Sequence, residues 1–310
     1  GLERLTLLYR SATADLARAQ SEGWPRDVQY YLNSLVAKAH GRIYAVRPRK
    51  QISLLAYFFG VIPVTFRRRF KYVLASAAIT IVAAAAAYAG ARADPSLAHE
   101  MLGGFAEAVE EFATSEATAG HYFADQPFVK YLGGTSFSAF LFLHNLKVAL
   151  QAFALGIAAG VLTVFVLIQN GVMLGAFLAI GANNGALGKL ASVIAPHGAL
   201  EIPAIIIAAT GGLLMGHALI NPGKWRRIDA LRLATREALA LLFCAAPLFV
   251  IAGIIEGNIS PLFRGPFATD AVRFAFAAGV FALLCLYLWR GDTTLSPALR
   301  ARLSEPPAWP

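Results

Sequence analysis

A histidine and a glutamate stand four residues apart in the segment PHGALEIPA (196–204), in a chain that carries few charges. If this segment is helical, His197 and Glu201 share one face. An imidazole beside a carboxylate can relay a proton, bind a polar ligand or supply two ligands to a metal ion. Three interpretations follow: a structural polar clamp between helices, a site for a solute, lipid headgroup or proton, and a zinc site.

The zinc interpretation needs more ligands than these two. Zinc takes three or four protein ligands, and the nearest third candidate is His144. The sequence contains no nucleophile elbow, no HExxH, no Walker A motif and no dinucleotide-binding motif. We therefore predict no catalytic residue and no cofactor, with zinc at His144, His197 and Glu201 as the alternative.

Further polar and helix-perturbing residues lie in apolar surroundings. The candidate site as a whole comprises Asn145, Lys147, Asn170, Gly171, His197, Gly198, Glu201, Pro203 and Glu256. Because a charge at membrane depth is costly unless it is paired, we expect Lys147 to pair with Glu201 or Glu256. We predict one layer of polar groups just beneath the non-cytoplasmic headgroups, formed by Asn145, Lys147, His197, Glu201 and Glu256.

The elements that would position these residues are membrane helices. No charged side chain occurs from residue 148 to 188, a length that suffices for two membrane crossings. Hydrophobic residues make up 57% and charged residues 15% of the chain, whereas soluble domains average about 25% charged residues. The sequence therefore predicts an all-α, polytopic membrane bundle. The six predicted spans are 72–91, 140–168, 171–190, 197–220, 238–255 and 274–289.

Two Asn-Gly sequences divide the long uncharged run. Gln169-Asn170-Gly171 is predicted to be the turn between the second and third spans, because Asn and Gly accept the left-handed geometry of helix ends. Asn183-Asn184-Gly185 would interrupt the third span. We predict that this span crosses with a broken outer end, and a re-entrant loop stays the alternative.

Loop charges give the orientation. With six spans, one side of the membrane holds twenty-one Lys and Arg residues and the other side four. Cytoplasmic loops collect Lys and Arg, so we predict a plasma-membrane protein with both termini in the cytoplasm. The formal net charge of +9 is then explained by these loops, and we expect no nucleic-acid partner.

Three segments are predicted to lie off the membrane. Residues 1–66 carry a 3–4 apolar spacing that indicates amphipathic helices at the cytoplasmic surface. Within the bundle, predicted over 67–290, the acidic outer segment 92–136 contains an amphipathic helix over 97–112. The tail 291–310 is predicted to be disordered. Next to the first span, Arg67, Arg68 and Arg69 form a topogenic charge run that would also bind anionic lipid.

Small residues one helical turn apart occur on three predicted spans. Such pairs let helix backbones approach closely, either within one bundle, which we favour, or between two copies. The glycines concerned are Gly156, Gly160, Gly171, Gly175, Gly181, Gly185, Gly212 and Gly216. From these faces and from the frequency of twofold oligomers we expect a homodimer.

Four sequence blocks resemble the stage II sporulation protein M family. They are FLHNLKVAL (142–150), QNGVMLGAF (169–177), PHGALEIPAIIIAATGG (196–212) and IEGNISP (255–261). The PHG-x2-EIPA block is the most specific of them, and the family often has Asn where this chain has His144. The resemblance covers roughly residues 60–290 and implies an all-helical, multi-span fold.

The resemblance also implies a function. In spore formers the named family member is a membrane partner of peptidoglycan-remodelling enzymes, an organiser and not a catalyst. We therefore expect a membrane scaffold, not an enzyme, that partners envelope proteins. The alternative is a transporter or channel for a small solute, ion or lipid, with the site around His197, Glu201 and Lys147. An intramembrane metal-binding protein is the remaining alternative.

Overall fold

The computed structural model describes residues 2–43, 53–114, 143, 145–255 and 269–290. The chain divides into two compact units, residues 1–52 and 53–310, which are described separately. Within the described residues every regular element is a helix. The predicted all-α fold class is confirmed.

The first unit is a helical hairpin of α1 (Leu2–Ser21) and α2 (Arg26–Ile43). The turn contains Gly23 at φ +69°, a left-handed conformation that glycine adopts at no steric cost. Pro25 directly precedes α2, where its fixed φ suits a helix start. The aromatic rings of Tyr9 and His40 lie 6.1 Å apart, so the start of α1 lies beside the end of α2.

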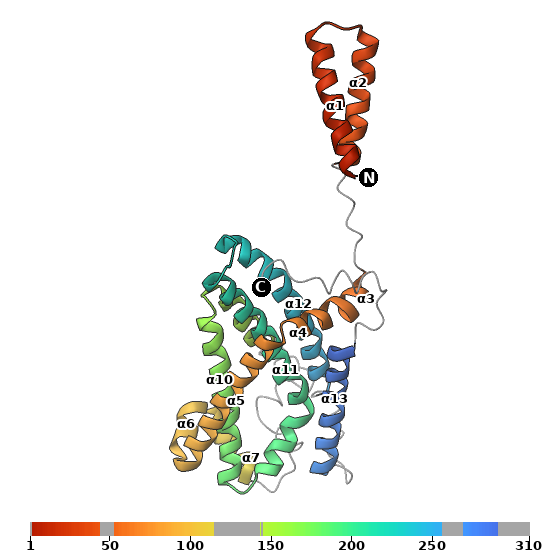
Figure 1. The fold of residues 1–310 in the computed structure, drawn as a ribbon. Coiled ribbons are helices and arrows are strands. Elements are labelled where there is room, and N and C mark those ends of the chain that lie inside the picture. Colours follow the sequence, from red (N-terminus) through yellow and green to blue (C-terminus); the bar gives the residue numbers. More distant parts are fainter. Residues whose placement is uncertain (1, 44–52, 115–142, 144, 256–268, 291–310) are drawn as a thin grey trace. The chain divides into compact units, whose positions relative to one another are not determined.

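Among its described residues, the second unit contains five helices that are long and apolar enough to cross a membrane (Figure 1). They are α5 (Phe70–Ala93), α10 (Val161–Asn183), α11 (Leu187–Ile220), α12 (Arg227–Ile254) and α13 (Asp270–Arg290). A shorter apolar helix, Asn145–Ile157, precedes α10. The count is close to the six predicted spans, with the short helix in the place of the second.

Short helices flank α5 on both sides. The elements α3 (Leu54–Ala56), η1 (Tyr57–Val61) and α4 (Ile62–Arg68) precede it. The elements α6 (Ser96–Leu102) and α7 (Phe105–Thr114) follow it. The single helix predicted over 97–112 is thus two helices, because Gly103 takes φ +57° and ends α6. The rest of the acidic segment, 115–136, and the tail 291–310 lie outside the described residues.

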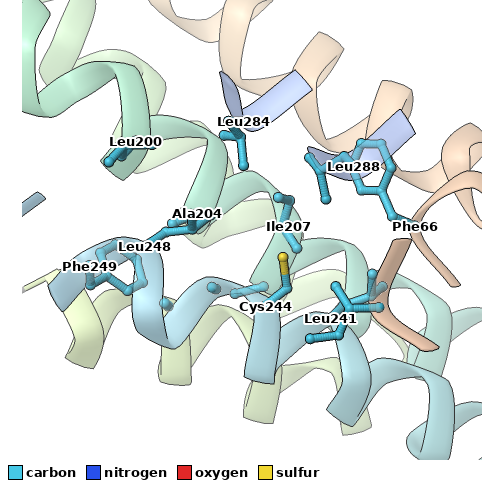
Figure 2. Packing of buried hydrophobic residues seen from close by; sticks show 14 of the residues in the cluster. Phe66, Leu200, Ala204, Ile207, Leu241, Cys244, Leu248, Phe249, Leu284 and Leu288 are labelled. Atoms are coloured by element: carbon cyan, nitrogen blue, oxygen red, sulfur yellow. The ribbon is translucent and has the colours of Figure 1, made fainter. Parts of the chain in front are cut away.

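The largest buried cluster lies mainly between α4, α11, α12 and α13, and it also includes Val73 of α5 and Ala149 of the short helix. Figure 2 shows Phe66 of α4 and Leu284 and Leu288 of α13 beside Ile207 of α11. Other members come from α12, among them Leu241, Cys244 and Phe249. Side chains of most helices of the bundle thus contribute to one apolar core, and α4 belongs to the bundle although it precedes the first long span.

The predicted turn at Gln169-Asn170-Gly171 is wrong. All three residues lie inside α10, and the chain reverses earlier, over residues 158–160, where Ala159 (φ 54°) and Gly160 (φ 79°) are left-handed. The Asn170 side chain donates a hydrogen bond to the Val166 carbonyl oxygen, 2.8 Å away. Asn170 therefore sits within the helix without ending it.

The predicted break in the third span is also wrong. Asn183-Asn184-Gly185 forms the turn between α10 and α11, with Gly185 at φ +69°. The fourth span therefore begins at Leu187 and not at His197, and α11 continues through Pro196 and Pro203 for 34 residues. The fifth span also starts earlier than predicted, since α12 begins at Arg227.

Candidate functional site

The contacts between the short helix and α11 show at which level of α11 the predicted site lies. A Cβ added to Gly156 would overlap the backbone of Gly212, and Gly160 lies against Gly216. In each pair, the α11 glycine follows its partner by the same number of residues. The short helix and α11 therefore run in the same direction. The same separation places Asn145 at the level of Glu201.

This level is near the middle of α11. At about 1.5 Å per residue, Glu201 lies roughly 21 Å from Leu187 and roughly 28 Å from Ile220. The predicted position just beneath the outer headgroups rested on a span that started at His197. Because α11 starts ten residues earlier than predicted, His197 and Glu201 lie well inside this helix and not in its first turn.

The other predicted site residues are spread over several environments. Lys147 is exposed, and within the described part of the chain it forms no ion pair with Glu201. Gly171 lies against the Thr80 carbonyl of α5, and Gly198 lies beside Ile194 one turn back in α11. Pro203 is half-buried within α11. Glu256 and His144 lie outside the described residues.

No metal-binding group can be assembled from the described residues. Nowhere in the described ranges do three His, Cys, Asp or Glu side chains come together. Cys244 is buried and Cys285 is exposed, and both are free thiols. Since His144 lies outside these ranges, the His144, His197 and Glu201 set stays a prediction.

The structure instead brings charged residues together at one end of the bundle, here called the basic end. There the start of α5 meets the ends of α11 and α13 and the start of α12. Arg69 is buried, and its Nε lies 2.6 Å from Oε2 of Glu237 on α12. Arg68 reaches the other oxygen of Glu237 at 3.3 Å. One carboxylate therefore binds two neighbouring guanidinium groups, which fastens the start of α5 to α12.

Two more contacts close the basic end. Arg67 donates to the carbonyl oxygens of Leu288 and Trp289, both at 2.9 Å, in the last turn of α13. These carbonyls have no partner within their own helix, and a cation is favoured at a helix C-terminus. The Tyr72 hydroxyl is hydrogen-bonded to Nδ1 of His217 on α11. The arginine run thus has a structural role in addition to its charge.

The opposite end, here called the acidic end, carries α6 and α7. Lys189 of α11 donates to the Phe112 carbonyl at 2.9 Å and lies 4.5 Å from the centre of the Phe112 ring. The Phe105 ring stacks on Phe177 of α10 with centroids 6.4 Å apart. These contacts fix α7 to the ends of α10 and α11.

A polar group at the acidic end joins α11 to α13. The hydroxyl of buried Ser192 donates to Asp270 at 2.7 Å and receives a hydrogen bond from Arg273 at 3.2 Å. Nearby, Ser96 donates two hydrogen bonds to Asp94, and these lower the pKa of the Asp94 carboxyl. The acidic end therefore keeps its own cross-helix polar contacts.

Sequence reasoning missed both groups of contacts. Glu237 directly follows a segment with five Lys and Arg residues after the fourth span, and a carboxylate at the end of such a basic segment was a usable signal. Ser192 gave no signal, because a serine in an apolar helix commonly bonds to its own backbone, as the Ser192 hydroxyl also does with the Lys189 carbonyl oxygen at 2.9 Å. Asp270 and Arg273 lie before the predicted start of the sixth span, which hid their position at the level of Ser192.

Comparison with known proteins decides the family. The model of the family described as stage II sporulation protein M matches residues 72–261, more than half of the chain. The chain belongs to the stage II sporulation protein M family. A second model, described as a domain of unknown function (DUF8413), matches residues 2–45. No curated protein and no solved structure matches the chain.

The two matches follow the architecture. The stage II sporulation protein M match runs from the first turn of α5 to beyond the end of α12 and includes His197, Glu201 and the glycine contacts between the short helix and α11. The second match coincides with the α1–α2 hairpin. This family member is therefore a multi-pass membrane bundle with an additional helical hairpin before it.

Proposed function

We propose that this protein is a membrane scaffold that holds partner-binding segments at both surfaces of the membrane, with envelope proteins such as peptidoglycan-remodelling enzymes as partners. The observation that carries the proposal is the platform formed by α6 and α7. It lies outside the long spans, yet it is fastened to them by Lys189 and Phe105. A rigid extramembrane platform suits a protein that positions another protein.

The platform has the chemistry of a docking surface. Glu100, Glu107 and Glu111 are exposed on it, and Met101 and Phe105 are 37% and 50% exposed. Apolar side chains ringed by charges are typical of protein interfaces. The negative charges favour a partner with a basic surface.

Site-specific cross-linking of the full chain in its native membrane tests the scaffold. A photo-reactive residue at Met101 should capture an envelope protein, and Glu107→Lys with Glu111→Lys should lower the yield. The matched control is the same residue at Leu283, which is 67% exposed on α13. Equal capture at both positions would contradict the proposal.

Transport is the second candidate, and one observation favours it. His197 and Glu201 lie near the middle of α11, close to Pro196 and Pro203, which cannot donate backbone hydrogen bonds to the preceding turn. Transporters build their sites where helix backbone is perturbed beside polar groups at the midplane. Proton flux should then fall in Glu201→Gln proteoliposomes while the melting temperature is kept. A scaffold should show no such flux in either protein.

We also propose that the basic end faces the cytoplasm at the plasma membrane. The support is the charge distribution: Arg67, Arg68, Arg69, Lys224 and Arg227 lie at this end, and acidic residues prevail at the other. In a Cys285→Ser background, Lys224→Cys should resist a membrane-impermeant maleimide in intact cells. Ser96→Cys, at the acidic end, should react. Reversed labelling would invert the orientation.

Two ligand proposals remain, each with its own test. Anionic lipid at Arg67, Arg68 and Arg69 is supported by their position at the basic end, although Glu237 already binds two of them. Native mass spectrometry with phosphatidylglycerol, on the protein and on Arg68→Gln, tests it. Zinc at His144, His197 and Glu201 predicts stoichiometric metal in the purified protein, measured by elemental analysis.

A further inference from the structure

The α1–α2 hairpin leaves large apolar side chains exposed. Among the described side chains of α1 and α2 only Ala19 is buried. Leu8, Tyr31 and Leu35 are 60%, 67% and 42% exposed. Short helices gain most of their stability from packing, and small units bury only a modest share of their surface. The hairpin therefore requires something to cover it.

The exposed residues of α2 form a second stripe beside the one that contacts α1. The stripe that contacts α1 consists of Leu32, Val36 and Ala39, which are half-buried and follow the 3–4 spacing of a helix interface. Tyr31 and Leu35 stand one turn apart on the adjoining side. A helix in a four-helix bundle contacts two neighbours and needs two adjoining apolar stripes. The hairpin supplies one neighbour, so α2 is built for another.

The charges indicate that the missing neighbour is protein and not lipid. Helices that bind a membrane surface carry Lys and Arg on their polar face. In the hairpin the basic residues alternate with Asp15, Glu22 and Asp27, and Arg18 pairs with Glu22 at 3.2 Å. Such a mixed surface is typical of helices packed against other helices.

We propose that the partner is a second copy of this hairpin, so that two chains form a four-helix bundle. Twofold pairing covers the same stripe on both copies at once. Every copy in a membrane displays its hairpin on the same side. The nine residues 44–52 between the units reach at most about 30 Å, enough for neighbouring hairpins to meet. Residues 2–45 then act as a dimerisation module.

This inference rests on the proposed function only in treating the hairpin as a protein-binding part of the chain. It assigns a role to the segment matched by a domain of unknown function. A monomeric protein could still bind partners through α6 and α7, and a dimer could still be a transporter. Failure of one proposal therefore leaves the other testable.

The test measures the oligomeric state of the full chain in phosphatidylcholine bilayers by single-molecule photobleaching. The unaltered chain should give two bleaching steps. Tyr31→Glu with Leu35→Glu should weaken dimerisation by at least about tenfold, as loss of central interface side chains does. The matched control is Tyr30→Glu: Tyr30 is 75% exposed and lies beside Tyr31 but on another side of the helix. It should stay dimeric.

A cross-link keeps the proposal falsifiable if the double variant unfolds the hairpin. In a Cys285→Ser background, where only buried Cys244 remains, Leu35→Cys should form covalent dimers with a short bismaleimide. Tyr30→Cys should form few. A monomeric unaltered chain, or equal cross-linking at both positions, overturns the proposal. So does a double variant that folds and stays dimeric.

Discussion

The membrane bundle and the N-terminal hairpin solve helix packing in opposite ways. In the bundle, glycines let backbones touch: a Cβ on Gly175 would overlap the Ala84 carbonyl, and one on Gly212 would overlap the Ala152 carbonyl. In the hairpin, helix contact leaves Tyr31 and Leu35 largely exposed. The glycine contacts of the bundle thus lie within one chain, whereas the hairpin leaves an apolar stripe uncovered.

This difference follows from the solvent of each region. Between helices in lipid there is no hydrophobic driving force, so close backbone contact and polar pairs must supply the stability. In water an exposed apolar stripe is itself the driving force for association. We therefore expect the bundle to be sensitive to added volume and the hairpin to added charge.

The largest expected effect is Gly212→Ala. The added methyl would force α11 from the short helix, because its neighbours are the backbone of Ala152 and the side chain of Thr163. Overpacking of this kind costs about 3 kcal/mol. The melting temperature in detergent should fall, with loss of a monodisperse peak in size-exclusion chromatography. Gly188→Ala on the same helix meets no atom within 4 Å and should leave both unchanged.

Loss of the carboxylate at the basic end should come next. Glu237→Ala removes the carboxylate that binds Arg69, whose side chain is only 7% exposed. Removing one member of a buried ion pair costs about 3 kcal/mol, somewhat less here because Arg68 lies nearer the surface. Denaturation in mixed micelles measures the loss. The control is Asp229→Ala, whose partner Arg232 is exposed and whose loss should cost below about 1 kcal/mol.

The sequence predicted the fold class and four of the five long helices, because membrane spans are recognised by their length and lack of charge. It misplaced the turn before α10, because a glycine in a turn and a glycine in a helix contact cannot be distinguished in the sequence. Gly160 takes a left-handed conformation, whereas Gly171 makes room for α5. Only the tertiary contact tells them apart.

The candidate site was predicted less well, for a related reason. Which residues can pair depends on which of them lie at the same level of the bundle. The start of α11 was predicted ten residues too late, so Glu201 was expected at the start of the helix, whereas it lies near the middle of α11. The contacts of Arg69 with Glu237 and of Ser192 with Asp270 join segments 168 and 78 residues apart. No local pattern encodes such separations.

A smaller loss of stability is expected where the backbone conformation of a glycine, and not the space around it, disfavours a side chain. Gly160 has φ +79°, but an added Cβ would meet only ordinary contacts, the nearest being Cα of Gly216 at 3.6 Å. Gly160→Ala should therefore cost about 1–2 kcal/mol from the left-handed backbone alone. Unfolding in mixed micelles measures it against Gly279→Ala, a helical position in open space. A loss as large as that of Gly212→Ala would show that the turn also needs the room.

The smallest effect is expected for volume added to the hairpin away from the exposed stripe. Ala17 is exposed on α1, so Ala17→Leu adds three carbons without displacing a neighbour, and exposed changes of this kind stay within about 0.5 kcal/mol. Both the melting temperature and the two-step photobleaching should be unchanged. If Ala17→Leu abolished the dimer while Tyr31→Glu with Leu35→Glu preserved it, the second copy would dock on the Ala17 side. The stripe through Tyr31 would then need a different occupant. The contrast between the bundle and the hairpin would still hold, but the hairpin would pair through the face that carries Ala17.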